Sequence, residues 1–106
     1  MKTVTVQELK QMMDSGSDIT LIDVREASER RVCSIEPSKF IPMHDIPENI
    51  GQIPSDRPCV VYCHHGIRSY VTIRHLENNY QFENLYNLNG GIDAWAREID
   101  PEMARY

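Results

Sequence analysis

Short apolar runs alternate with helical patterns along this chain, and this alternation limits its fold more than any other feature. Residues 19–24 and 59–62 are largely apolar and rich in β-branched side chains, which is typical of strands covered on both faces. Alternating strands and helices build a layered fold around a mostly parallel sheet. We therefore predict a three-layer α/β fold, with a mostly parallel central sheet of about five strands flanked by helices on both faces.

Capping and turn residues locate the other elements. Thr5 and Glu8 fit a capping box at the start of a first helix, which residues 15–17 should end. By the same criteria we expect helices at 27–31, 47–52, 69–79 and 92–98, and further strands at Val4, 40–41 and 84–88.

Length and composition exclude several classes of protein. A chain of 106 residues is one domain, residues 1–106, that can bury a core without disulfides. Its net charge of −5 argues against binding to the phosphate backbone of nucleic acids. No leader-like or membrane-spanning apolar stretch is present, so we expect a cytoplasmic protein without membrane contact. The odd number of cysteines favours reduced thiols, with Cys33 and Cys59 as packing residues.

The segment after the second apolar run contains the residues of the chain that are best suited to a reactive site. Cys63 directly follows the predicted strand, and residues 64–69 (His-His-Gly-Ile-Arg-Ser) lead into a predicted helix. Free N–H groups and the macrodipole at a helix N-terminus favour a thiolate. Arg68 adds a permanent cation that could also hold an anionic substrate, and Gly66 permits close backbone approach. We interpret this loop as a nucleophile inside an anion-binding cradle.

Two other interpretations of Cys63 have to be weighed. A cysteine after an apolar strand is often a small core residue, but Gly66 and Arg68 have no obvious purpose in a merely structural turn. A metal site at Cys63, His64 and His65 would need ligand spacings that the sequence lacks, because neighbouring histidines project differently. We therefore expect an activated cysteine, with no metal and no cofactor.

Asp23 falls, like Cys63, at the carboxyl end of a predicted parallel strand, where ligands bind in folds of this class. Its carboxylate could accept hydrogen bonds that fix the loop, or pair with a nearby arginine such as Arg25. We predict that Asp23 and Arg25 support the site structurally.

Three blocks of sequence resemble the rhodanese family of sulfurtransferases in order and spacing. They are residues 21–26 (Leu-Ile-Asp-Val-Arg-Glu), the loop at 63–69, and residues 87–95 (Asn-Leu-Asn-Gly-Gly-Ile-Asp-Ala-Trp). The resemblance covers most of the chain and implies a rhodanese-like fold. Within the last block, Gly90 and Gly91 are expected to turn the chain out of the final strand.

The resemblance also implies an activity. Cys63 matches the family's catalytic cysteine, which takes a sulfane sulfur from a donor such as thiosulfate as a persulfide and passes it to a thiol or to cyanide. The implied substrate-binding residues are His64, His65, Gly66, Ile67, Arg68 and Ser69. The implied partners are a small sulfur donor and a thiol acceptor, such as thioredoxin or another protein thiol. We expect a monomer or a weak dimer.

Two comparisons with related patterns sharpen this expectation. Ser34 stands where the family usually has a histidine, so a ring that could pack beneath the first strand is missing. Cysteine phosphatases of similar fold place five residues between cysteine and arginine, whereas four separate Cys63 from Arg68. The shorter loop suits a single sulfur atom better than a tetrahedral phosphate.

An alternative of a different class stays open. The same loop would serve a persulfide carrier or protein-interaction module that receives sulfur from one protein and delivers it to another, with little activity on thiosulfate. In that case the rim residues His64, His65 and Ile67 would meet the partner.

Overall fold

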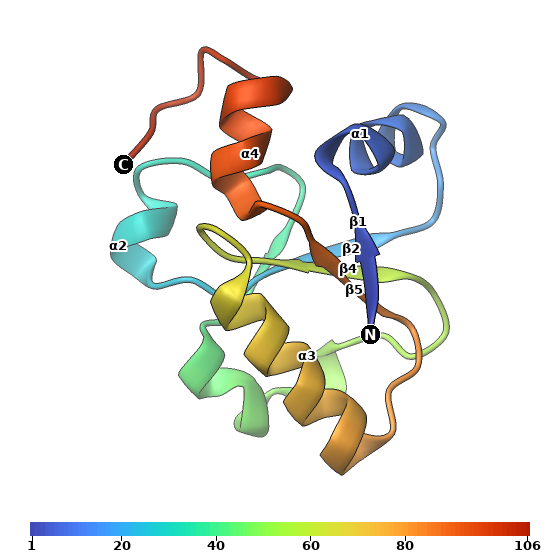
Figure 1. Cartoon of the computed structure of the whole chain (residues 1–106). Coiled ribbons are helices and arrows are strands. Elements are labelled where there is room, and N and C mark those ends of the chain that lie inside the picture. Colours follow the sequence, from blue (N-terminus) through green and yellow to red (C-terminus); the bar gives the residue numbers. More distant parts are fainter.

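A parallel sheet of five strands forms the centre of the molecule (Figure 1). The computed structural model describes all residues from 1 to 106. Across the sheet the strands follow the order β1 (Lys2–Val4), β5 (Leu85–Leu88), β4 (Cys59–Tyr62), β2 (Thr20–Asp23) and β3 (Lys39–Phe40). The two apolar runs, β2 and β4, thus occupy interior positions, where both of their faces are covered.

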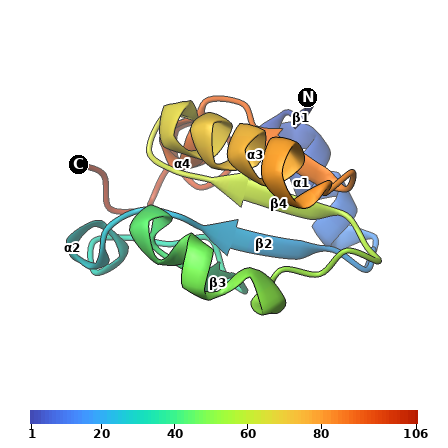
Figure 2. The same cartoon turned by 90° about the horizontal axis from the view of Figure 1, so that it is seen from below.

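Helices cover both faces of the sheet (Figures 1 and 2). On one face, α1 (Val6–Asp14) packs against α4 (Gly91–Glu98). On the other face, α3 (Ile67–Tyr80) packs against the 3-10 helix η1 (Met43–Glu48). The remaining elements are short, namely α2 (Ala27–Arg30) and the 3-10 helix η2 (Ile50–Gln52). None of these helices combines the length and the apolar character needed to cross a membrane.

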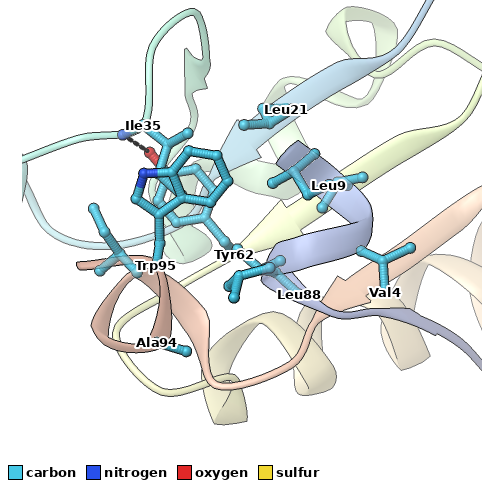
Figure 3. Close-up of a cluster of buried hydrophobic side chains, with 11 residues drawn as sticks. Val4, Leu9, Leu21, Ile35, Tyr62, Leu88, Ala94 and Trp95 are labelled. Carbon is cyan, nitrogen blue, oxygen red and sulfur yellow. Dashed lines mark hydrogen bonds between the residues drawn. The ribbon is translucent and has the colours of Figure 1, made fainter. Parts of the chain in front are cut away.

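Alternating side chains along the strands build one hydrophobic core on each face. The core under α1 and α4, drawn in Figure 3, includes Leu9, Leu21, Val60, Tyr62, Leu88 and Trp95. The core under α3 and η1 includes Ile22, Ile46, Cys59, Val61, Cys63, Ile73 and Leu85. The sheet therefore separates two apolar layers, and Cys63 belongs to the layer under α3.

The fold class and the predicted order of elements are confirmed, with two corrections. The helix expected at 69–79 begins two residues earlier, at Ile67, because Gly66 caps it in a left-handed conformation with φ of 110°. The helix expected at 47–52 is wrong in extent and type, since two 3-10 helices cover 43–48 and 50–52. An α-helix that started at Met43 would need an N–H at Pro47, which proline lacks, and the chain instead uses shorter-range bonds such as Asn49 N–H to Ile46 O at 2.9 Å.

The first turn of α4 lies directly against the loop after β4. The Ile92 N–H donates to the Cys63 carbonyl at 2.9 Å, and the Asp93 N–H donates to the His64 carbonyl at 3.1 Å. A Cβ atom on Gly91 would lie 2.5 Å from the Cys63 carbonyl oxygen, and the φ of this residue is +60°. Only glycine fits at this position, so Gly91 sets the distance between α4 and the loop.

We expect Gly91→Ala to destabilise the protein by about 3 kcal/mol, because the new methyl group meets two backbone carbonyls and the φ is unfavourable. Urea denaturation measures the change in the free energy of unfolding. Gly51→Ala is the matched control, since open space surrounds Gly51, and its effect should stay within about 0.5 kcal/mol. Equal effects of the two variants would contradict this assignment of Gly91.

Candidate active site

Cys63 occupies the turn between β4 and α3, with only 1% of its surface exposed. Its Sγ accepts hydrogen bonds from the backbone N–H of Gly66 at 3.1 Å and from that of Ser69 at 3.4 Å. The Ser69 hydroxyl oxygen lies 3.4 Å from the same sulfur. Donors therefore converge on Sγ from the first turn of the helix, an arrangement that stabilises negative charge on sulfur.

Asn87 in β5 holds this cradle together, and sequence reasoning assigned it no role. The Ser69 hydroxyl donates to Asn87 Oδ1 at 2.5 Å, while Asn87 Nδ2 donates to the Gly66 carbonyl at 3.0 Å. The side chain is 7% exposed. The available signal was a polar residue in an otherwise apolar strand, where a buried amide needs partners.

Arg68 does not stand free at the loop. Its two terminal nitrogens donate to the two carboxylate oxygens of Glu29 at 2.7 and 2.8 Å. This hydrogen-bonded pairing lowers the pKa of Glu29 from its ordinary 4.5 to about 2 and raises the pKa of Arg68. The carboxylate from α2 is a partner of Arg68 that the sequence did not indicate, and it matches the charge of the guanidinium. Binding of an anionic substrate by Arg68 stays a prediction.

Tyr106 joins this group from the far end of the sequence. Its hydroxyl donates to Glu29 Oε2 at 2.8 Å and accepts from Arg25 Nη1 at 3.0 Å. Its ring stacks on His64, with ring centroids 4.0 Å apart and an interplanar angle of 14°. Burial raises the pKa of Tyr106 to about 12. Burial, followed by the neighbouring His65, lowers the pKa of His64. Nothing in the sequence pattern pointed to Tyr106.

The remaining loop side chains form the rim of the site. Ile67 is 74% exposed and contributes no contact to the cradle. His65 is also exposed, and its Nδ1 lies 3.9 Å from Asp93 Oδ2. These side chains are thus available to an incoming molecule, whereas Gly66 contributes its N–H to the cradle and Ser69 contributes both its N–H and its hydroxyl.

Asp23 and Arg25 form a buried ion pair next to the loop. Both side chains are fully buried, and Arg25 donates from Nε to Asp23 Oδ1 at 2.9 Å and from Nη2 to Oδ2 at 2.8 Å. The Tyr62 hydroxyl and Arg30 also reach Asp23, at 3.3 and 3.0 Å. Both oxygens of Asp23 are engaged by five hydrogen bonds from Arg25, Arg30 and Tyr62, which fits the predicted structural role of this residue.

The segment around Ser34 packs without the family's usual histidine. Ser34 Oγ donates to Glu36 Oε1 at 2.6 Å at the surface. Ile35 is buried, and its N–H donates to the Tyr62 hydroxyl at 3.2 Å, the dashed bond in Figure 3. An isoleucine and a backbone hydrogen bond thus anchor this loop to the core.

The other two cysteines lie apart from the cradle. Cys59 is buried in the core under α3, and burial raises the pKa of its thiol to about 11. Cys33 is half-buried and packs against the opposite core. No group of three or more His, Cys, Asp or Glu side chains is arranged to hold a metal ion.

Comparison with known proteins places this site in a family. A family model for the rhodanese-like domain matches residues 5–98. The chain is 37% identical to a protein named sulfurtransferase from Allochromatium vinosum, over 92% of this chain and 91% of that protein. It is 36% identical to the probable adenylyltransferase/sulfurtransferase MoeZ of Mycobacterium tuberculosis, over 98% of this chain. The chain spans only 27% of the length of MoeZ.

A solved structure agrees with these relationships. The rhodanese-like domain protein from Staphylococcus aureus superimposes with a TM-score of 0.83 and 32% identity, covering 90% of this chain and 91% of that one. Sequence, fold and the cysteine loop therefore lead to one conclusion: this chain belongs to the rhodanese-like domain family.

Proposed function

We propose that this protein is a sulfurtransferase that works by double displacement through a persulfide on Cys63. The sulfur would come from a donor such as thiosulfate or a thiol-borne persulfide and pass to a thiol or to cyanide. Relatives named sulfurtransferase support sulfur transfer as the reaction. The free state of all three cysteines is consistent with action in the cytoplasm, where protein thiols stay reduced.

The observation that carries this proposal is the convergence of donors on a buried sulfur. In the first half-reaction, the Cys63 thiolate attacks the sulfane sulfur, and the electron pair of the donor's S–S bond leaves with sulfite or a thiolate. The outer sulfur of the resulting persulfide carries the negative charge next. The N–H groups of Gly66 and Ser69 lie 3.1 and 3.4 Å from Cys63 Sγ, where they would stabilise the thiolate that attacks and, after the transfer, the sulfur that carries the persulfide.

A sulfur relay between proteins is the second candidate function. The chain matches one part of the larger MoeZ protein, whose name includes both adenylyltransferase and sulfurtransferase. Exposed Ile67, Tyr70 and Val71 share one face of α3 at positions i, i+3 and i+4, and this apolar patch next to the loop also favours contact with a protein surface. In a relay, the acceptor would be a protein thiol, and turnover with cyanide would be slow.

We expect incubation with a sulfane donor to add one sulfur atom to the protein, detected by intact mass, and subsequent cyanide to release thiocyanate. Cys63→Ser should abolish both signals, because serine cannot form a persulfide. Cys33→Ser, at a half-buried cysteine away from the cradle, is the control and should retain both. The proposal is wrong if neither thiosulfate nor a persulfide loads sulfur on Cys63. Loading by a cysteine desulfurase but not by thiosulfate would favour the relay.

We expect Asn87→Ala to slow sulfur transfer by about tenfold, because the Gly66 carbonyl and the Ser69 hydroxyl lose their common anchor and the cradle loosens. Single-turnover loading of Cys63, followed by mass, measures this rate. Asn78→Ala removes an exposed amide from α3 and serves as the control. An Asn87→Ala protein that loads sulfur at the wild-type rate would show that the cradle does not need this anchor.

A further inference from the structure

The cations around the loop are already matched by carboxylates of the protein itself. Arg68 forms its two-point ion pair with Glu29. Arg97 and Arg105 both bind Asp93, at 3.1 and 3.2 Å. Burial, followed by the neighbouring His65, lowers the pKa of His64 and so disfavours a charge on its ring. An anion that approaches Cys63 therefore meets N–H groups but little net positive charge.

The Glu29 carboxylate is fixed in place by more than Arg68. Its Oε1 accepts the backbone N–H of Glu26 at 3.0 Å, the capping box of α2. Its Oε2 accepts the Tyr106 hydroxyl at 2.8 Å. Tyr106 is itself held by Arg25 at 3.0 Å. Two groups besides Arg68 therefore hold the Glu29 carboxylate, the Glu26 N–H and the Tyr106 hydroxyl, and they oppose its displacement by an incoming anion.

The possible sulfur donors differ in charge. Thiosulfate is a dianion and releases sulfite, which is also a dianion, whereas a thiol-borne persulfide carries at most one charge at its reacting end. The protein's net charge of −5 repels a dianion further. Arg68 lies in the first turn of α3 and directly precedes Ser69, whose N–H donates to Cys63 Sγ at 3.4 Å. The Glu29 carboxylate thus neutralises Arg68, the cation of the loop itself that could favour thiosulfate.

We propose that Glu29 is a specificity-determining residue, which neutralises Arg68 and makes the site select thiol-borne persulfides over thiosulfate. This inference rests on the proposed sulfurtransferase function and names its donor class. The step balances: the Cys63 thiolate attacks the outer sulfur of R–S–SH, a new S–S bond forms, and the old one breaks. The products are the Cys63 persulfide and the thiolate R–S⁻. The electron pair of the broken S–S bond leaves with R–S⁻, so the donor is reduced while the Cys63 sulfur is oxidised.

The test compares donors in wild type and in Glu29→Gln, which keeps the capping box but removes the charge. The donors are thiosulfate, N-acetylcysteamine persulfide generated in situ, and a cysteine desulfurase charged with L-cysteine. We expect Cys63 of the wild-type protein to take up sulfur faster from the two persulfide donors than from thiosulfate. Glu29→Gln should raise kcat/KM for thiosulfate at least about tenfold, chiefly through KM, and change the N-acetylcysteamine rate less than about twofold. Inhibition by sulfite should strengthen by a similar factor.

Two further variants separate this effect from general changes. Glu83→Gln removes the same charge at an exposed position beyond the far end of α3, about 20 Å along the helix, and should leave the thiosulfate rate unchanged. The double variant Glu29→Gln/Arg68→Gln should lose the increase in kcat/KM for thiosulfate, because that increase depends on an Arg68 guanidinium without its carboxylate partner. Comparing N-acetylcysteamine persulfide with the charged cysteine desulfurase shows whether a small persulfide or a protein-bound persulfide is the better sulfur donor.

The outcomes separate the two proposals. If no donor loads Cys63 in wild type, the proposed function fails, and sulfite binding to Glu29→Gln, measured by calorimetry, still tests the role of the ion pair. If persulfides load Cys63 but Glu29→Gln leaves both the thiosulfate rate and the sulfite affinity within twofold of wild type, the inference about Glu29 is wrong. Equal gains from Glu83→Gln, or a wild-type preference for thiosulfate, would also overturn it.

Discussion

The contact between the first turn of α4 and the loop after β4 determines the geometry of everything around Cys63. Two N–H groups that a helix start leaves without partners bind the carbonyls of Cys63 and His64. With those carbonyls held on one side, the following N–H groups can turn toward Sγ on the other. The contact needs a residue without a side chain at position 91, where a Cβ atom would meet both carbonyls. Helix packing and sulfur chemistry therefore depend on the same glycine.

A series of polar contacts connects the buried Asp23–Arg25 ion pair to Arg68 in the loop. The buried pair of Asp23 and Arg25 offsets the cost of removing both charges from water by satisfying their hydrogen bonds. Arg25 then orients Tyr106, Tyr106 holds Glu29, and Glu29 binds Arg68. This chain of contacts links the interior under α4 to the first turn of α3. The electrostatics of the cysteine loop are consequently set by residues that do not touch the sulfur.

Sequence reasoning succeeded where local patterns decide the structure. The apolar runs of β2 and β4 and the capping box at Thr5 were identified because periodicity and capping act over a few residues. The same holds for the position of Cys63. The partners of the loop were missed because they come from distant segments: Asn87 from β5, Glu29 from α2 and Tyr106 from the last residue. A pattern in the sequence can suggest an arginine near a cysteine, but only the fold shows which carboxylate it binds.

The cradle is built almost entirely from main-chain atoms. Carbonyls at 63 and 64 are bound by α4, and N–H groups at 66 and 69 bind the sulfur. The side chains of His65 and Ile67 point away from this framework into solvent. Substitutions at these two exposed positions can therefore change the outer surface of the loop without altering the contacts of Cys63 Sγ. Under the proposed function, reactivity and recognition would then depend on different atoms of the same short segment.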